Sequence, residues 1–254
     1  MNEIQIIGVD IAPSKKSTIY DGNCYLYMSA DELNNYLISL QNDKYKTVLL
    51  CWDAPLTGPQ TTTRNNYIFR SGDFTKRIIE KEYFNVPKGI SVMGYASCPH
   101  WTITKFLTGY PIIGDYCLKE NLPFTLVTNE ETQIENGKKY IAEVHPALSI
   151  WLLMKDTVAE EYNWIYKDMN VIELNSFSAD FNATLMAILP KESNVKIVMT
   201  TPQNDDELDA YAAWLMGYLW VNKINLNNFS IKLVGSKENG CIILPQTFNA
   251  KANV

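Results

Sequence analysis

Apolar residues in the first sixty positions gather into short runs, and two of these runs end at an aspartate. Ile4–Asp10 is the first run, and Thr47–Trp52, which Asp53 follows directly, is the second. Apolar runs of this length are typical of parallel strands that are covered on both faces. Because ligands of α/β proteins bind at the carboxyl ends of the strands, we expect Asp10 and Asp53 to converge there.

The residues between these two runs predict a hairpin and a helix. Ser17–Tyr20 and residues 24–28 are rich in β-prone residues, and the turn sequence Asp21-Gly22-Asn23 separates them, which is typical of a β-hairpin. Ser29 then offers a helix cap, and apolar residues follow at helical spacing over 33–40. The order strand, hairpin, helix, strand predicts one edge of a mixed α/β sheet.

Further elements follow in the second half of the chain. We expect strands at residues 139–144 and 195–200, helices from Pro146 to about 155 and from Asp205 to about 222, and β-prone runs at 231–234 and 241–244. Proline suits the first turn of a helix because its missing N–H would be unpaired there in any case. The whole set predicts one α/β domain over residues 1–254.

Residues 58–138 differ in composition and are predicted to form a large insertion after the fourth strand, as a lid or as one wall of a cleft. Glycine, proline, asparagine and threonine are frequent there, and basic residues interleave with aromatic ones. This mixture suits a phosphate-bearing or single-stranded nucleic acid, and Arg64 and Arg70 are the candidate substrate contacts. It also fits a solvated basic helix with aromatic residues in the core.

Composition narrows the class of protein. The net charge is −6 and the isoelectric point is about 5.1, which argues against a protein that coats nucleic acid but leaves room for an enzyme with a local basic groove. No apolar run approaches the ~20 residues of a membrane span, and the N-terminus lacks the pattern of a signal peptide. We expect a cytoplasmic protein with no membrane association.

Acidic residues stand where a metal centre for phosphoryl transfer needs them. Glu143 ends the predicted strand at 139–144, and Asp206 and Asp209 share one face of the late helix because they are three positions apart. Buried acids are costly unless a cation or hydrogen bonds compensate them. Mg²⁺ prefers carboxylate oxygens, and two ions ~4 Å apart can clamp the attacking and leaving oxygens of a displacement at phosphorus. The candidate metal ligands and catalytic residues are Asp10, Asp53, Glu143, Asp206 and Asp209, with Mg²⁺ or Mn²⁺ as the expected cofactor.

Three other side chains are candidates for catalysis or substrate binding. His145 follows Glu143 by two positions and could move a proton or orient a phosphate, although a histidine bonded near a helix start explains it equally well. Lys15 and Lys16 follow the first strand and could contact substrate phosphate, or lie in an exposed turn. The sequence contains no nucleophile elbow, P-loop or dinucleotide-binding glycine pattern that would favour another chemistry.

Four motifs in order resemble the RNase H-like superfamily, and more closely the predicted nucleases catalogued as domain of unknown function 429. They read Gly8-Val9-Asp10, Asp53-Ala54-Pro55-Leu56, Glu143-Val144-His145-Pro146 and Asp205-Asp206-Glu207-Leu208-Asp209-Ala210. The resemblance implies a mixed five-stranded sheet flanked by helices. It also implies metal ligation by Asp10, Asp53 and Asp209, with Asp206 or Glu143 as the fourth ligand. The residues after Asp10 depart from the glycine-rich turn usual in that family.

Three functions compete at this point. The first is a metal-dependent nuclease in which two ions activate water, with a nucleic acid or nucleotide as its substrate. The second is an actin-like ATPase or phosphotransferase, in which the acid on the first strand also holds Mg²⁺. The third is a catalytically inactive module of the RNase H-like fold that binds nucleic acid or nucleotide. Sequence alone leaves the substrate and the oligomeric state open.

Overall fold

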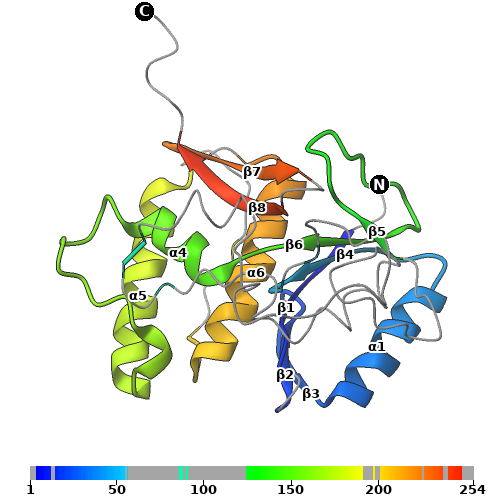
Figure 1. Cartoon of the computed structure of the whole chain (residues 1–254), viewed down its shortest axis with the longest axis horizontal. Helices are drawn as coiled ribbons and strands as arrows, with labels where there is room; N and C mark the ends of the chain where they lie inside the picture. The colour runs from blue at the N-terminus through cyan, green and yellow to red at the C-terminus, as the bar shows by residue number, and fades with distance from the viewer. Residues whose placement is uncertain are drawn as a thin grey trace, which may run out of the picture.

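A mixed six-stranded sheet forms the centre of the molecule in the computed structural model (Figure 1). The structure describes residues 4–12, 15–54, 56, 86–87, 90, 124–190, 197, 201–224, 226–236 and 240–247. The sheet has the order β3-β2-β1-β4-β6-β5, and a separate two-stranded sheet pairs β7 with β8. The strands are β1 (Ile4–Asp10), β2 (Ser17–Tyr20), β3 (Tyr25–Met28), β4 (Thr47–Trp52), β5 (Thr125–Leu126), β6 (Lys139–Glu143), β7 (Phe229–Ser236) and β8 (Gly240–Thr247).

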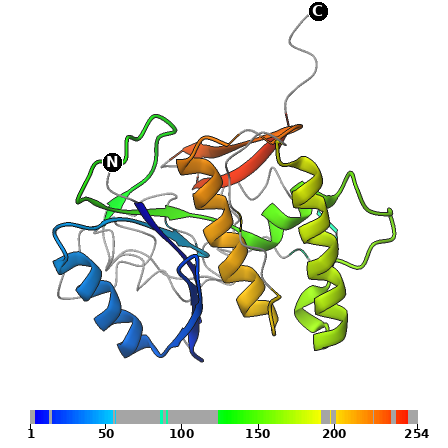
Figure 2. The same cartoon turned by 180° about the vertical axis from the view of Figure 1, so that it is seen from behind.

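The helices of the described residues cover both faces of the six-stranded sheet. They are α1 (Ala30–Asn42), α4 (Pro146–Met154), α5 (Val171–Ile188), α6 (Asp205–Val221) and the short 3₁₀ helix η3 (Tyr166–Asp168). Figure 2 shows α1 on one side of the sheet and α6 on the other. The core follows this division, because Ile7 and Leu50 pack with the leucines of α1, whereas Ile6 and Leu49 pack with α4, α5 and α6.

Strand directions bring the predicted acids to one edge. β1 pairs in parallel with β4, and β4 pairs in parallel with β6, so that Val9 is level with Trp52 and Trp52 is level with Glu143. Asp53 N–H donates to the Val9 carbonyl at 3.0 Å, which extends the ladder by one residue beyond β4. The predicted convergence of Asp10 and Asp53 is therefore confirmed.

Two glycines let α6 lie unusually close to the sheet. A Cβ atom on Gly8 would stand 2.1 Å from the Ala210 carbonyl oxygen and 2.4 Å from the Trp214 nitrogen. A Cβ on Gly217, farther along α6, would stand 2.1 Å from Cys51 Sγ. Real Cβ atoms do not come this close to other atoms. The packing of α6 therefore requires glycine at position 8, where backbone atoms block the space, and a side chain at position 217 would force Cys51 Sγ to move.

Local signals explain where the helices begin. Ser29 caps α1 in a capping box with Glu32, as the sequence predicts, because its hydroxyl accepts an N–H that the first turn leaves unpaired. Asn170 forms the same motif with Glu173 at the start of α5. In the β2–β3 hairpin, Gly22 has φ +96° and lies against the Trp214 indole, so this turn needs glycine for its backbone and for its packing.

Several sequence-based expectations need correction or stay open. The sheet has six strands rather than five, because Thr125 and Leu126 pair in parallel with β6 although they fall inside the range assigned to the insertion. The 18-residue helix α5 was not predicted at all. Most of residues 58–123, including Arg64 and Arg70, and most of the expected strand at 195–200 lie outside the described residues. The insertion and the single-domain organisation stay predictions.

The two β-prone runs near the C-terminus form the β7–β8 hairpin. β8 contacts the main sheet through an isolated parallel bridge between Val144 and Ile243, directly after β6. Its residues Ile242 to Leu244 join the core on the α6 side of the sheet. None of the helices in the described part of the chain is long and apolar enough to span a membrane.

The contact at Gly8 gives a first prediction. Gly8→Ala should push α6 away from β1, because the added methyl group meets backbone atoms that cannot rotate away. We expect the free energy of unfolding to fall by about 1–3 kcal/mol or more, together with weaker binding of Mn²⁺. Urea denaturation and calorimetric titration measure the two effects.

Gly217→Ala is the matched control. It strains the same helix against Cys51, but about two helical turns away from Asp209. It should lower stability and change Mn²⁺ affinity much less. Equal losses of Mn²⁺ affinity in the two variants would contradict a specific link between Gly8 and the carboxylates.

Candidate metal centre

Three aspartates from three separate elements meet at the carboxyl edge of the sheet. Asp10 ends β1, Asp53 follows β4, and Asp209 lies in the second turn of α6. Each offers a carboxylate oxygen, and these oxygens all lie within 4.8 Å of one another. Because hard divalent cations take oxygen ligands, and because like charges this close repel one another, the arrangement fits a cation site.

The start of α6 is held in place by contacts at its N-terminus. The Asn204 side chain caps the helix by accepting the Glu207 N–H at 2.9 Å. The Glu207 carboxylate in turn accepts the Gln203 N–H at 2.7 Å and the Tyr27 hydroxyl from β3. Glu207 is buried, so it serves as an anchor for the helix rather than as an exposed ligand. These bonds fix the direction in which Asp206 and Asp209 project.

Asp209 is almost completely buried, at 1% exposure, and two groups from η3 satisfy its carboxylate. The Tyr166 hydroxyl donates to Oδ1, and Lys167 Nζ lies 2.9 Å from Oδ2. Tyr166 is itself buried and packs against Phe177 of α5 at a ring distance of 5.1 Å. The pair Tyr166 and Lys167 thus orients Asp209 toward the other two aspartates.

Sequence reasoning did not find Tyr166 and Lys167. They lie between α4 and α5, where no motif or apolar period marks a functional segment. The capping box at Asn170 could have revealed the start of α5, but nothing local shows that the residues before it reach α6. The contact of Tyr166 joins positions 43 residues apart. Tertiary packing brings them together, because α4 packs against both α5 and α6 and η3 packs against α5.

The electrostatics of the three aspartates favour protonation of Asp10 and Asp53. Burial chiefly, and the charges of Asp209 and Glu143, raise the pKa of Asp53 from 3.8 to about 8. The charge of Lys167 opposes part of this rise. Burial, followed by the charges of Asp209, Asp53 and Asp206, also raises the pKa of Asp10 well above its ordinary value. A divalent cation would reverse this balance because it stabilises the carboxylate form.

Glu143 lies on the neighbouring strand but outside the group of three. It is buried at 3% exposure, and its Oε2 accepts the Leu56 N–H at 2.8 Å. Its charge reaches Asp53, whose pKa it raises. Glu143 therefore binds the Leu56 backbone, and its expected role as a fourth metal ligand stays a prediction.

Asp206 and the predicted basic turn meet at the rim of the cluster. Lys15 Nζ donates to Asp206 Oδ1 at 2.7 Å, and the Lys15 side chain is 57% exposed. Asp206 is close enough to raise the pKa of Asp10. Lys16 is also exposed, but it lies near Glu32 instead. Hydrogen bonds with Ser29 chiefly lower the pKa of Glu32, and the charge of Lys16 lowers it further. Of the two lysines, Lys15 is the one that the structure places beside the acids.

His145 has the structural role that the sequence left open as an alternative. It is the N-cap of α4, and its Nδ1 accepts the Leu148 N–H at 3.4 Å. It follows directly after Val144, which continues the ladder by donating to the Trp52 carbonyl at 3.0 Å. A part in proton transfer stays a prediction for this residue.

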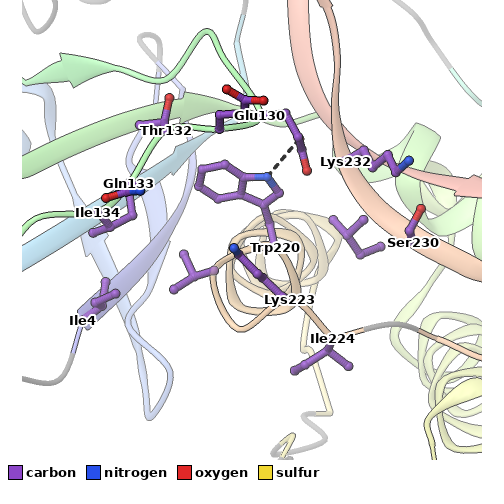
Figure 3. A pocket seen from close by; sticks show the side chains of 13 residues that line it. Ile4, Glu130, Thr132, Gln133, Ile134, Trp220, Lys223, Ile224, Ser230 and Lys232 are labelled. Atoms are coloured by element: carbon purple, nitrogen blue, oxygen red, sulfur yellow. Dashed lines mark hydrogen bonds between the residues drawn. The ribbon is translucent and has the colours of Figure 1, made fainter. Parts of the chain in front are cut away.

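A pocket of about 870 Å³ lies at the opposite end of α6 from the aspartates (Figure 3). Trp220 lines it and donates from Nε1 to Glu130 at 3.2 Å, and Ile4 at the start of β1 lines it too. Because β1 and α6 each run from one site to the other, none of the candidate acids borders this pocket. The candidate centre is therefore defined by its chemistry and not by this cavity.

The raised pKa of Asp53 predicts how stability depends on pH without metal. The folded protein holds the Asp53 proton more tightly than the unfolded chain, so this group makes the free energy of unfolding fall as pH rises from about 4 to about 8. Asp53→Asn removes the charge. We expect the free energy of unfolding of this variant to exceed that of the unaltered protein by on the order of 2 kcal/mol at pH 8, after allowance for solvent screening. Near pH 4 the two values should match.

Guanidinium unfolding in EDTA across this pH range measures the effect. Asp156→Asn, which alters an exposed acid paired with Lys155, is the control and should follow the unaltered protein. Parallel curves for Asp53→Asn and the unaltered protein would contradict the electrostatic account of the cluster.

The bond from Tyr166 to Asp209 gives another prediction. Tyr166→Phe removes the donor that orients Asp209, and loss of such an outer partner typically weakens metal binding 10–100-fold. Tyr140→Phe is the control, because it also removes a buried hydroxyl, one that bonds Glu135 and Gln133 at the far end of β6. Titration calorimetry with Mn²⁺ should show a loss for Tyr166→Phe only, and an equal loss in both variants would argue against the orienting role.

Comparison with known proteins assigns no family to the chain. The resemblance to RNase H-like nucleases therefore rests on the four sequence motifs and stays a prediction. The function has to be argued from the three aspartates and the residues around them. The chain matches no protein-family model, and no curated protein and no solved structure is significantly similar to it.

Proposed function

We propose that this protein is a metal-dependent phosphodiester hydrolase, a nuclease of RNase H-like type. The observation that carries the proposal is the convergence of Asp10, Asp53 and Asp209, whose ligand oxygens lie within 4.8 Å of one another. These residues are far apart in sequence and come from two strands and a helix. Acids kept this close at a cost in electrostatic energy point to a ligand that compensates them.

The topology supports the RNase H-like part of the proposal. Five of the six strands, in the order β3-β2-β1-β4-β6, form a mixed sheet in which β1, β4 and β6 are parallel and β2 is antiparallel to both β1 and β3. α1 connects the hairpin to β4. This is the strand, hairpin, helix, strand order that the resemblance implies, with β5 added at the far edge.

The donor set fits Mg²⁺ or Mn²⁺ better than a softer metal. All three groups are carboxylates, and Cys51, the cysteine of β4, is buried in the core against α6 rather than facing the acids. Oxygen ligands select hard cations. A bound cation would lower the pKa of a coordinated water and neutralise charge on the phosphate.

The aspartates and Lys15 would have different roles in the hydrolysis. Asp10, Asp53 and Asp209 would hold the cation and place the phosphate beside it. Lys15, half exposed at the rim, is positioned to contact a nonbridging phosphate oxygen. In the hydrolysis a water oxygen bonds to phosphorus, the ester P–O bond breaks, and the proton lost by water balances the one gained by the leaving oxygen. No side chain has to form a covalent bond.

Cleavage of a panel of labelled single-stranded DNA, single-stranded RNA, duplex and hybrid tests the proposal. We expect cleavage of at least one substrate with Mn²⁺ or Mg²⁺, none in EDTA, and a loss of more than about 100-fold in Asp10→Asn, beyond the range for losing an outer partner of a ligand. Asp156→Asn should keep full activity.

The other two functions correspond to other outcomes of the same experiment. ATP hydrolysis that depends on Asp10, without nucleic-acid cleavage, would replace the nuclease by the actin-like ATPase. Metal and nucleotide binding without turnover of any substrate would replace it by an inactive binding module. Either result would overturn the proposal.

A further inference from the structure

Lys167 stands among the three aspartates as a cation that the chain itself supplies. Its Nζ lies 2.9 Å from Asp209 Oδ2, and its side chain is 49% exposed whereas that of Asp209 is 1% exposed. The lysine thus reaches from the surface to a buried carboxylate. The contact pairs its ammonium group with one oxygen of the Asp209 carboxylate.

The backbone around Lys167 fixes this placement. The Asn163 side chain accepts the Ile165 N–H at 3.0 Å, and Asp168 N–H donates to the Ile165 carbonyl at 3.2 Å. Tyr166, the preceding residue, is buried and donates to the same carboxylate of Asp209. Two consecutive residues therefore engage the two oxygens of Asp209, which makes the lysine part of the centre and not an exposed side chain that happens to be near it.

Two divalent ions would bring four positive charges to a cluster of three carboxylates. Asp10, Asp53 and Asp209 carry three negative charges when ionised, and Lys167 cancels one of them. The remaining two charges match a single divalent ion. Asp206 is paired with Lys15 at the rim, and Glu143 bonds the Leu56 backbone, so the neighbouring acids are also engaged. A second divalent ion on Asp209 would stand beside the ammonium group and be repelled by it.

We propose that the ammonium group of Lys167 takes the place of the second cation, so that the centre binds one divalent ion rather than two. Asp10, Asp53 and Asp209 would hold the single ion. Lys167 then faces the substrate phosphate from the Asp209 side and stabilises its negative charge, as a second ion would. This refines the proposed function and rests on it, and it replaces the two-ion centre expected from sequence.

The number of Mn²⁺ ions bound per chain tests the proposal. Titration calorimetry and electron paramagnetic resonance count the ions in the full chain, with thymidine 5′-monophosphate present and absent. We expect one ion for the unaltered protein in both conditions. Lys167→Met, which keeps much of the length and removes the charge, should bind two ions and give the signal of a spin-coupled pair. Lys167→Arg should restore binding of one.

A matched control and the unaltered protein keep the test decisive. Lys155→Met removes a lysine from an exposed pair with Asp156 and should still bind one ion. Two ions on the unaltered protein, or one on a folded Lys167→Met, would overturn the proposal, and circular dichroism checks the fold. If Lys167→Met fails to fold, the count on the unaltered protein with and without nucleotide decides alone.

The failures of this inference and of the proposed function are distinguishable. Two ions together with metal-dependent cleavage would retain the nuclease and remove the role of Lys167. One ion without cleavage of any substrate would retain the role of Lys167 at the centre and remove the nuclease. Absence of Mn²⁺ binding in every variant would overturn both.

Discussion

The close packing of α6 on Gly8 is the constraint on which the rest of the structure depends. Ala210 and Trp214 of α6 occupy the space that any side chain at position 8 would need. Asp209 directly precedes Ala210, and Asp10 lies two residues after Gly8. Bringing the two backbones together therefore brings the two carboxylates together. Helix packing therefore explains why glycine stands first in the motif Gly8-Val9-Asp10. This reason is separate from the chemistry of Asp10.

The close packing of α6 on β1 is possible because α6 is surrounded by other elements. α6 contacts β1, β2 and β4 on one side and α4, β7 and β8 on others, and it is apolar around most of its circumference after the first turn. A helix of this kind belongs in the interior. The acids of α6 all lie within its first five residues, and this end of the helix lies at the edge of the sheet where β1 and β4 end. The helix thus places charge at one defined end of an otherwise apolar core.

The cluster of acids is held together against its own repulsion by several distinct contacts. Tyr166 and Lys167 engage Asp209, Lys15 engages Asp206, and strand pairing fixes Asp10 beside Asp53. Burial chiefly, and the charges of the neighbouring acids after it, raise the pKa values of Asp10 and Asp53. Preorganised repulsion of this kind is typical of functional sites, where a ligand supplies the missing charge. In the proposal made above, the charge of Lys167 limits the centre to one ion.

The sequence by itself determined the strands that end in Asp10 and Asp53, the hairpin with Gly22, and the starts of α1, α4 and α6. These features rest on apolar runs, turn residues and caps, which act between residues near one another along the chain. The sequence also identified the three acids of the cluster, because charged residues at the ends of apolar runs stand out. Only the tertiary structure decided that β5 extends the sheet, that Glu143 and His145 bond the backbone, and that Tyr166 and Lys167 reach Asp209. Those contacts join distant segments whose approach depends on helix packing, and no local pattern records it.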